Sequence, residues 1–530
     1  MNPVAPSPAV RAVVGVIAVL GYGSIWPVGE MARAQMQPAV TFELPKVCQA
    51  NLEEAVPQPG QAQDHLPGDW LGLARNPLLL PTRPDEVEIT EQRAISLEQA
   101  VALAYRNSPD LETARLTVER SQAALEEARA SLTPTVDLNA GLDGLTNPGQ
   151  GQSLGNNDGN DDGDDNGDND STPSPVGVVT GNIGASYDIL TGGERAARIR
   201  SAELQLQQQR LTLEQAQQEA RSQASLAYYE VQSTRERIRI SQAFLTESCR
   251  NMRDAILFFD ADVGTRFDVL RADVQVAQAR QDLVLARSNW RTAQRRLTAL
   301  LNLPPDTTIT TTTVRIGGFW PLTLEESIVL ALQNRAELAE DRVQQDIADA
   351  QRQIALAPIR PRLEATGSVN AALALTDIAG ANIAGFDRNS SAGFGIGVGG
   401  RWRVFDGGAA VARAHQAEHD QAIAIAAFGQ SRNQVRLEVE ESYYDLETNL
   451  ANIDTARTAL EQAREALRLA QRRFDAGVGD QLEVLQAQRA LTEAQVRLLE
   501  AVLGYNRALT ALERAVSNLA GQGRGGTLQR

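Results

Sequence analysis

Four segments of the chain alternate apolar and polar residues at every second position. They cover 134–143, 178–190, 361–373 and 392–405. Successive side chains of a β-strand point to opposite faces, so the pattern predicts four strands, each with one apolar and one polar face. Strands of about ten residues are long enough to cross a bilayer when tilted. Half-buried strands of a soluble sandwich share this pattern, but nothing else in the sequence would cover their apolar face.

A helical pattern surrounds each pair of strands. A helix is predicted over 96–131, with Ser96 as its cap and Pro134 after its end. Two segments almost free of helix breakers, 193–262 and 408–475, predict helices of roughly 100 Å at ~1.5 Å per residue. Return helices are predicted over 268–301 and 482–517. The narrow seam of small apolar residues indicates coiled-coil neighbours packed in a wall rather than a globular core; it includes Ala216, Ala220, Ala224, Ala227 and Val231.

The chain repeats itself once. Asn107 matches Asn334 at an offset of 227, which Pro134 and Pro361 keep, whereas Tyr228 matches Tyr443 at an offset of 215. The difference of 12 residues falls in one place, the loop from about 144 to 178. This internal duplication predicts two repeats, 92–305 and 318–517, each built as helix, two strands, long helix and return helix.

The ends of the chain have a different composition. Arg11, an apolar run over 12–20 and the small residues Ala32 and Ala34 indicate a secretory signal over 1–34, with a retained anchor as the alternative. The segment 35–91 is rich in proline and is predicted to be extended and irregular. Residues 518–530 are predicted to form a flexible tail. No apolar stretch after the signal approaches 18 residues, so a membrane location requires strands.

Charge and cysteine content narrow the possible functions. The formal charge of −17 argues against a nucleic-acid backbone as partner. The two cysteines, Cys48 and Cys249, allow at most one disulfide, and the sequence leaves open whether they meet.

The number of strands predicts an oligomer. Two hairpins cannot close a barrel, and an open sheet edge in lipid leaves backbone groups unpaired. Two copies give eight strands, whose interior side chains would fill, whereas three give twelve and leave room for water. We therefore predict an α+β membrane protein in which each copy contributes four strands to a trimeric, 12-stranded transmembrane β-barrel. Tyr187, Phe394 and Trp402 are predicted to lie at the membrane interface.

With this plan, the segments 263–270 and 473–488 resemble those of the outer-membrane efflux family that includes TolC. The resemblance covers roughly residues 92–517. It implies a homotrimer in the outer membrane, whose barrel continues as a long α-helical coiled-coil tunnel across the periplasm. Such ducts carry efflux or type I secretion, and they dock to a periplasmic adaptor and an inner-membrane pump. The resemblance implies neither an enzyme nor a cofactor, since the pump supplies the energy.

The resemblance also assigns roles to residues at the helix tips. Glu483 matches an acidic position that rings the periplasmic mouth, Gln486 stands where a second aspartate is often found, and Asp268 is the counterpart of Glu483 in the first repeat. These three are candidate gate residues. A solvated helix face is the alternative interpretation of these three residues.

The candidate adaptor contacts lie in the two turns between the long helices and the return helices: Val263, Gly264, Thr265, Val478, Gly479 and Asp480. A plain turn without a docking role is the alternative interpretation of these residues.

Two other patterns suggest chemistry less strongly. His415 and His419 match the H-x-x-E-H pattern of some zinc peptidases. Their counterparts in the first repeat, 200–204, lack such residues, which favours a solvated helix face. The acidic loop 158–170 lacks the spacing of an EF-hand, so a mobile anionic loop is favoured over calcium binding.

Two further classes remain as alternatives to an export duct. A diffusion porin needs more strands in one chain and no long helices. The hypothesis of a structural coiled-coil protein of the envelope explains the helices but does not account for the alternating strands. The sequence does not identify the cargo.

Overall fold

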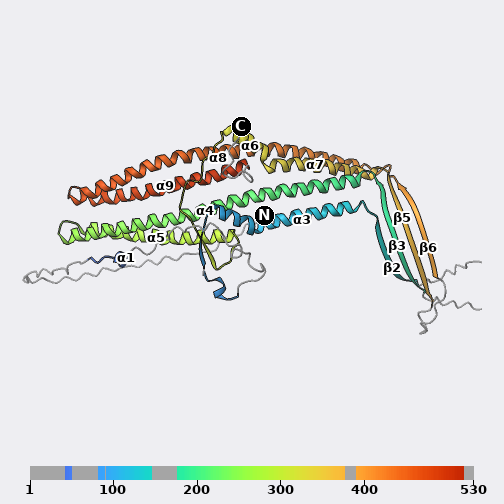
Figure 1. The fold of residues 1–530 in the computed structure, drawn as a ribbon, viewed down its shortest axis with the longest axis horizontal. Helices are drawn as coiled ribbons and strands as arrows, with labels where there is room; N and C mark the ends of the chain where they lie inside the picture. The colour runs from blue at the N-terminus through green and yellow to red at the C-terminus, as the bar shows by residue number, and fades with distance from the viewer. Residues whose placement is uncertain (1–41, 50–81, 90, 146–175, 377–389, 518–530) are drawn as a thin grey trace, which may run out of the picture.

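The computed structural model describes residues 42–49, 82–89, 91–145, 176–376 and 390–517. The predicted signal, most of the proline-rich segment, the acidic loop and the predicted tail lie outside these residues. The described part is elongated, with its helices along the long axis and its longer strands together at one end (Figure 1). Among the described residues, no helix combines the length and the apolar character that crossing a lipid bilayer requires.

The same order of long elements occurs in both halves. The long helices α4 and α8 have 67 residues each. The first half contains α2 (Leu97–Asn107), α3 (Pro109–Ala130), β2 (Thr135–Leu145), β3 (Val176–Thr191), α4 (Glu194–Asp260) and α5 (Arg266–Leu300). The second half contains α6 (Leu324–Asn334), α7 (Ala336–Leu356), β5 (Arg362–Thr376), β6 (Ser390–Arg401), α8 (Ala409–Asp475) and α9 (Gln481–Val516).

The single helix expected over 96–131 is two helices, α2 and α3. Ser96 caps α2 as expected, and its side chain accepts from the Gln99 backbone N–H at 3.2 Å. The break falls at Ser108, which has an extended backbone and precedes Pro109. Proline has no N–H to continue the first helix and disfavours a helical residue before it. The apolar periodicity continues across the break, so periodicity alone did not show it.

The four long strands form one antiparallel sheet in the order β2-β3-β5-β6. Leu138 pairs with Ile183, Ile183 with Val369, and Val369 with Phe394. Directly paired residues share a face, so these apolar side chains form one surface. Leu138 and Phe394 are 74% and 84% exposed. The opposite surface carries polar residues, among them Thr135, Asp137, Asn139, Asn182, Ser368 and Asn370.

Two details of the sheet differ from the sequence prediction. β6 ends at Arg401, so Trp402 lies beyond the strand, where its indole N–H donates to the Ile359 carbonyl at 3.0 Å. A register shift between Asp188 and Leu190 in β3 removes Ile189 from the alternation. A bulge inserts one residue into a strand, which period-two patterning does not reveal.

A short parallel sheet that the sequence did not indicate joins the two ends of the first half. β1 (Glu91–Ile95) pairs with β4 (Thr307–Thr311) and packs against the middle of α4. Arg235 of α4 is 2% exposed, and it donates to the Thr311 carbonyl at 2.6 Å and pairs with Glu236. The short elements are α1 (Lys46–Gln49) and the 3-10 turns η1 (Pro84–Val87) and η2 (Ala357–Ile359).

One disulfide joins the segment before the first repeat to α4. Cys48 and Cys249 are bonded and buried, which resolves the alternative that the sequence left open. The described chain therefore has no free cysteine.

Tyr228 anchors α4 to the short sheet, and its removal tests this junction. Its hydroxyl lies 3.1 Å from the Ile95 carbonyl and accepts from the Thr312 N–H at 3.2 Å. Tyr228→Phe leaves these groups unpaired, so we expect the free energy of unfolding to fall by about 1–2 kcal/mol. Tyr444→Phe, at an exposed ring, is the control. Equal stability of both variants in thermal or denaturant unfolding would contradict this role.

Burial raises the pKa of the Tyr228 hydroxyl. The unfolded chain ionises this group near its ordinary pKa of about 10, whereas the fold keeps it neutral to higher pH. The contribution of the neutral hydroxyl to the free energy of unfolding is therefore complete below the pKa of the unfolded chain. This contribution is lost as pH rises through the pKa of the folded protein. We expect Tyr228→Phe to show a smaller stability loss between neutral and alkaline pH than the parent. A loss of the same size in both proteins would remove Tyr228 from the alkaline response.

Candidate functional site

The end of the molecule opposite the four-stranded sheet consists of two helical tips (Figure 1). The first tip joins α4 to α5 through 261–265, and the second joins α8 to α9 through 476–480. The N–H groups of Val263 and Gly264 donate to the Phe258 carbonyl at 3.0 and 2.8 Å. Those of Val478 and Gly479 donate to the Arg473 carbonyl at 3.0 and 2.9 Å. The two turns thus satisfy the last carbonyls of their helices in the same way.

Crowding accounts for the glycine in each Val-Gly pair. A Cβ on Gly264 would lie 3.1 Å from the Phe258 backbone, and one on Gly479 would lie 2.9 Å from the Arg473 backbone. The preceding valines face outward, with Val263 76% and Val478 71% exposed. Each turn therefore presents an apolar side chain at the end of a polar hairpin.

Three of the sequence-predicted residues start the return helices. The Asp268 carboxylate accepts from the Thr265 backbone N–H at 3.2 Å, and the Thr265 hydroxyl accepts from the Asp268 N–H at 3.3 Å. This capping box begins α5. Asp480 caps α9 by accepting from the Leu482 N–H at 2.9 Å. Asp268 is thus engaged within its own turn, a role that the gate interpretation did not include.

Glu483 is paired with a cation of its own hairpin. Its Oε1 lies 3.1 Å from Arg473, and its Oε2 is buried with no hydrogen-bond partner in the described part of the chain. Gln481 is 6% exposed, and both of its amide atoms also lack a described partner. Gln486 is exposed. Arg473 was not assigned a role from sequence, although its position ten residues before Glu483 across the turn is a usable signal.

The two tips differ at the position of Arg473. Its counterpart in the first repeat is Phe258, whose ring packs edge-on against Phe474 of the second tip at 5.0 Å. Asp268, the counterpart of Glu483, therefore has no such arginine from its own helix α4. The carboxylate of the second tip is partly neutralised, whereas an aromatic contact joins the two tips.

Polar side chains connect the hairpins just before the tips. Asn251 of α4 donates to Gln488 of α9 at 2.6 Å, and Arg489 of α9 donates to Gln275 of α5 at 2.6 Å. Gln471 of α8 donates to Glu247 of α4 at 2.7 Å. Water replaces such bonds at a modest net cost of about 1 kcal/mol each. The contact between hairpins is therefore weaker than an apolar seam of similar length.

The H-x-x-E-H pattern forms a surface ion-pair cluster. Glu418 lies 3.1 Å from His415 Nδ1 and 2.9 Å from Arg352. The hydrogen bond from His415, followed by that from Arg352, lowers the pKa of the exposed Glu418 carboxyl. Within the described ranges, no group of three or more His, Cys, Asp or Glu side chains is placed to hold a metal ion.

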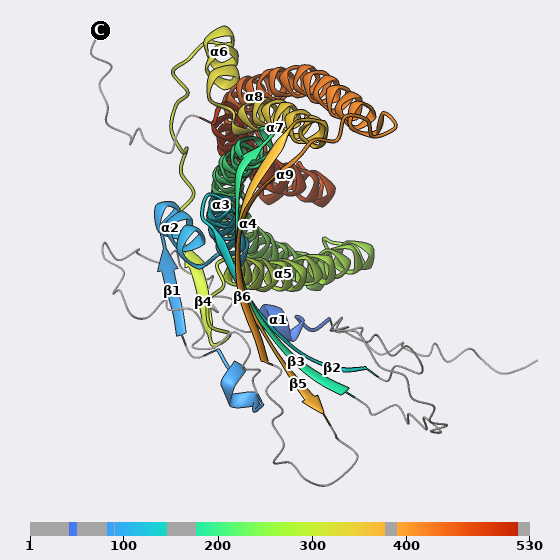
Figure 2. The ribbon, with the colours of Figure 1, turned by 90° about the vertical axis from the view of Figure 1, so that its right-hand side faces the viewer.

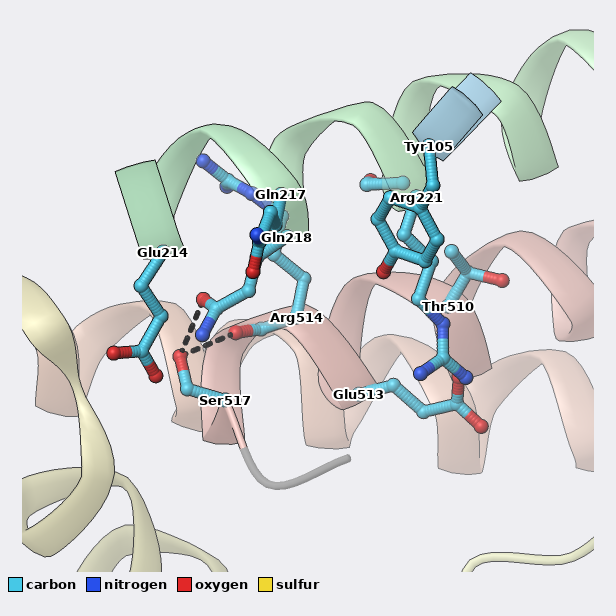
Figure 3. A pocket seen from close by; sticks show the side chains of 10 residues that line it. Tyr105, Glu214, Gln217, Gln218, Arg221, Thr510, Glu513, Arg514 and Ser517 are labelled. Atoms are coloured by element: carbon cyan, nitrogen blue, oxygen red, sulfur yellow. Dashed lines mark hydrogen bonds and ion pairs between the residues drawn. The ribbon is translucent and has the colours of Figure 1, made fainter. Parts of the chain in front are cut away.

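A small pocket lies where α2, α4 and the end of α9 meet (Figure 3). Arg221 pairs with Glu513 at 3.1 Å, and the Ser517 hydroxyl donates to Gln218 at 2.9 Å. Burial raises the pKa of the Tyr105 hydroxyl, and Arg221 partly opposes this shift. The cavity of about 60 Å³ has room for a few waters but not for a drug-sized solute. The pocket is a polar helix junction.

Gly479→Ala tests the crowding in the second turn. The added Cβ meets backbone atoms at 2.9 Å, so the turn must shift, and we expect local destabilisation of about 1–3 kcal/mol. Amide hydrogen exchange of 474–482 measures it. Gly429→Ala is the matched control, because nothing lies within 4 Å of its Cβ and alanine favours a helix. Unchanged exchange in Gly479→Ala would contradict this explanation of the Val-Gly pair.

Comparison with known proteins identifies the family. The outer membrane efflux protein family matches residues 100–303 and 327–518. The pyoverdine export outer membrane protein OpmQ of Pseudomonas putida is 28% identical over 435 residues, which cover 79% of this chain and 85% of OpmQ. The outer membrane efflux protein BepC of Brucella suis is 23% identical over 417 residues, covering 78% of this chain and 84% of BepC.

Solved structures have the same fold. The CmeC outer membrane channel of Campylobacter jejuni aligns with a TM-score of 0.66 at 15% identity, covering 79% of this chain and 85% of CmeC. VceC of Vibrio cholerae aligns with a TM-score of 0.62 at 20% identity, covering 79% of this chain and 96% of VceC. The family resemblance of the sequence is thereby confirmed. The chain belongs to the outer membrane efflux protein family, a family of channel proteins located in the outer membrane and extending into the periplasm.

Proposed function

We propose that three copies of this chain form the exit duct of a tripartite efflux or type I secretion system. The observation that carries this proposal is the four-stranded sheet, which has one apolar, exposed face and is joined directly to two 67-residue helices. An apolar sheet face of this size is stable in lipid but a liability in water. The long helices give the duct its reach into the periplasm.

The two edges of the sheet support assembly. β2 and β6 are its outer strands, and all neighbours are antiparallel. β6 of one copy therefore meets β2 of the next in the antiparallel sense. Three copies close twelve strands with no edge left in lipid, and a barrel of this size encloses water.

The two faces of the sheet fit such a barrel. Polar side chains such as Asp137, Asn182 and Asn370 would line the water-filled lumen, and the apolar face would contact lipid. Tyr187, with Arg195 over its ring at 5.3 Å, and Trp402 lie at the helical end of the sheet. Phe394 lies nearer the other end of β6. We propose all three as interface aromatics.

The helical tips are the proposed docking site for a periplasmic adaptor, which couples the duct to an inner-membrane pump. The exposed valines Val263 and Val478 offer apolar anchors, and rigid hydrogen-bonded turns hold them in place. Anchors of this kind bind with little loss of conformational entropy. Gly264, Thr265, Gly479 and Asp480 serve the docking surface by fixing the shape of the turns.

The proposed gate is the ring formed by Glu483, Gln486 and Asp268 from each copy. Like charges brought together at a narrow mouth repel one another and attract cations. The Arg473–Glu483 pair reduces this repulsion at the second tip. The strength of the acidic ring therefore depends on a pair between two exposed side chains.

Channel recordings of the purified protein in planar bilayers test the duct and its gate. We expect discrete channel openings that favour cations. Glu483→Gln should lower cation selectivity, whereas Arg473→Gln should raise it by releasing the carboxylate. Glu493→Gln is the matched control, because Glu493 pairs with Arg497 farther along α9.

Two results would count against these proposals. Absence of channel activity would contradict the duct. Equal selectivity in the Glu483, Arg473 and Glu493 variants would remove Glu483 from the gate.

A further inference from the structure

The segment 42–49, here called the strap, lies against the first tip. The Cys48–Cys249 disulfide bonds it to α4 across 201 residues of sequence. The Phe42 ring packs edge-on against Phe259, the penultimate residue of α4, at 5.3 Å. Leu44 and Val47 pack against the same apolar cluster, which contains Met252 and Ile256 of α4 and Val269 of α5. The strap therefore follows the last turns of α4 to the tip.

The sequence of the second hairpin shows that this covering is specific to the first. The offset of 215 places Arg464 at the position of Cys249 and Gln471 at that of Ile256. Arg464 is exposed and pairs with Glu461 at 2.9 Å. Two positions under the strap, Cys249 and Ile256, are thus polar on α8, whereas the counterparts of Met252 and Phe259 are Leu467 and Phe474 and stay apolar. The cysteine that fastens the strap has no equivalent on α8.

The strap lies at one edge of the molecule. In Figures 1 and 2, α8, α9, α4, α5 and α1 follow one another in the same order. Contacts of α9 with α4 and α5 support this order, as in the Asn251–Gln488 and Arg489–Gln275 bonds. The β1–β4 sheet lies to the side of this row in Figure 2. The strap therefore contacts both helices of the first hairpin on the side away from α9, and α8 lies at the opposite end of the row.

We propose that the strap lies in the seam between subunits, where a second copy of this chain covers it with α8. This inference rests on the proposed trimer, because a closed ring brings the α5 edge of one copy to the α8 edge of the next. The α5 edge also carries exposed apolar side chains near the tip: Phe267, Leu270 and Val274 are 63%, 46% and 57% exposed. Within the described residues, these α5 side chains and the strap's exposed residues lack a covering element.

The charges of the two edges are compatible. The strap exposes Glu43 and Lys46. At the level of Cys249, α8 exposes Glu461 and Glu465, each hydrogen-bonded within the helix to Arg464 or Arg468. Opposite charges across a seam fix its register. The disulfide holds Lys46 in place for such a contact, since Cys48 is only two residues away.

Lys46 makes the proposal directly testable, because it is the only lysine in the chain. A carbodiimide joins an amine to a carboxylate without a spacer. Every cross-link that uses a side-chain amine must therefore contain Lys46. We expect the purified full-length protein to give covalent dimers and trimers on denaturing gels. Peptide mapping is expected to find Lys46 joined to Glu461 or Glu465 of another copy. Lys46→Arg, which keeps the charge, should lose these products.

A second variant separates the effect of the strap's position from the effect of the lysine itself. Cys48→Ser combined with Cys249→Ser releases the strap, and we expect the yield of covalent dimer to fall severalfold while Lys46 remains. Trimers, verified by mass, that give only products within one chain would overturn the seam assignment. Dimer yields that do not change in either variant would overturn it as well. A monomeric mass would instead reject the trimer on which the inference rests.

Discussion

Unpaired backbone groups at β2 and β6 are the constraint on which the organisation of this protein depends. A single copy supplies four strands with one apolar face and two open edges. Each unpaired backbone group costs several kcal/mol in hydrocarbon, so a sheet of this kind is stable in a bilayer only when its edges find partners. The antiparallel order of the sheet makes copies of the same chain suitable partners. The proposed trimer and the water-filled duct both follow from this constraint.

At the helical tips, interactions within each hairpin fix the structure more than contacts between the hairpins do. Each turn is locally well determined, because backbone hydrogen bonds, a helix cap and a crowded glycine fix its shape. Near the tips, several contacts between the hairpins are side-chain hydrogen bonds, for which water substitutes at low cost, and they lie beside the Phe258–Phe474 ring contact. Each proposed docking surface is therefore determined mainly within its own hairpin. On the first hairpin, the Cys48–Cys249 bond adds a covalent fastening that α8 and α9 lack within the described residues.

Much of this architecture was predictable because it rests on local patterns. Period-two alternation indicated four strands, and the absence of helix breakers indicated the long helices. Interactions over long sequence distances were not predictable in this way. The β1–β4 sheet joins segments more than 200 residues apart, and the Cys48–Cys249 disulfide joins residues separated by 201 positions. The break at Ser108 and the bulge after Asp188 leave the apolar periodicity nearly intact, so periodicity did not reveal them.

The number of chains in the particle tests the edge constraint most directly. Native mass spectrometry of the protein, released from outer membrane in mild detergent, measures this number without reference to any partner. Three copies per particle is the expected result, because twelve antiparallel strands close with every edge paired and leave water inside. A stable, folded monomer would contradict it, since β2 and β6 would then remain unpaired.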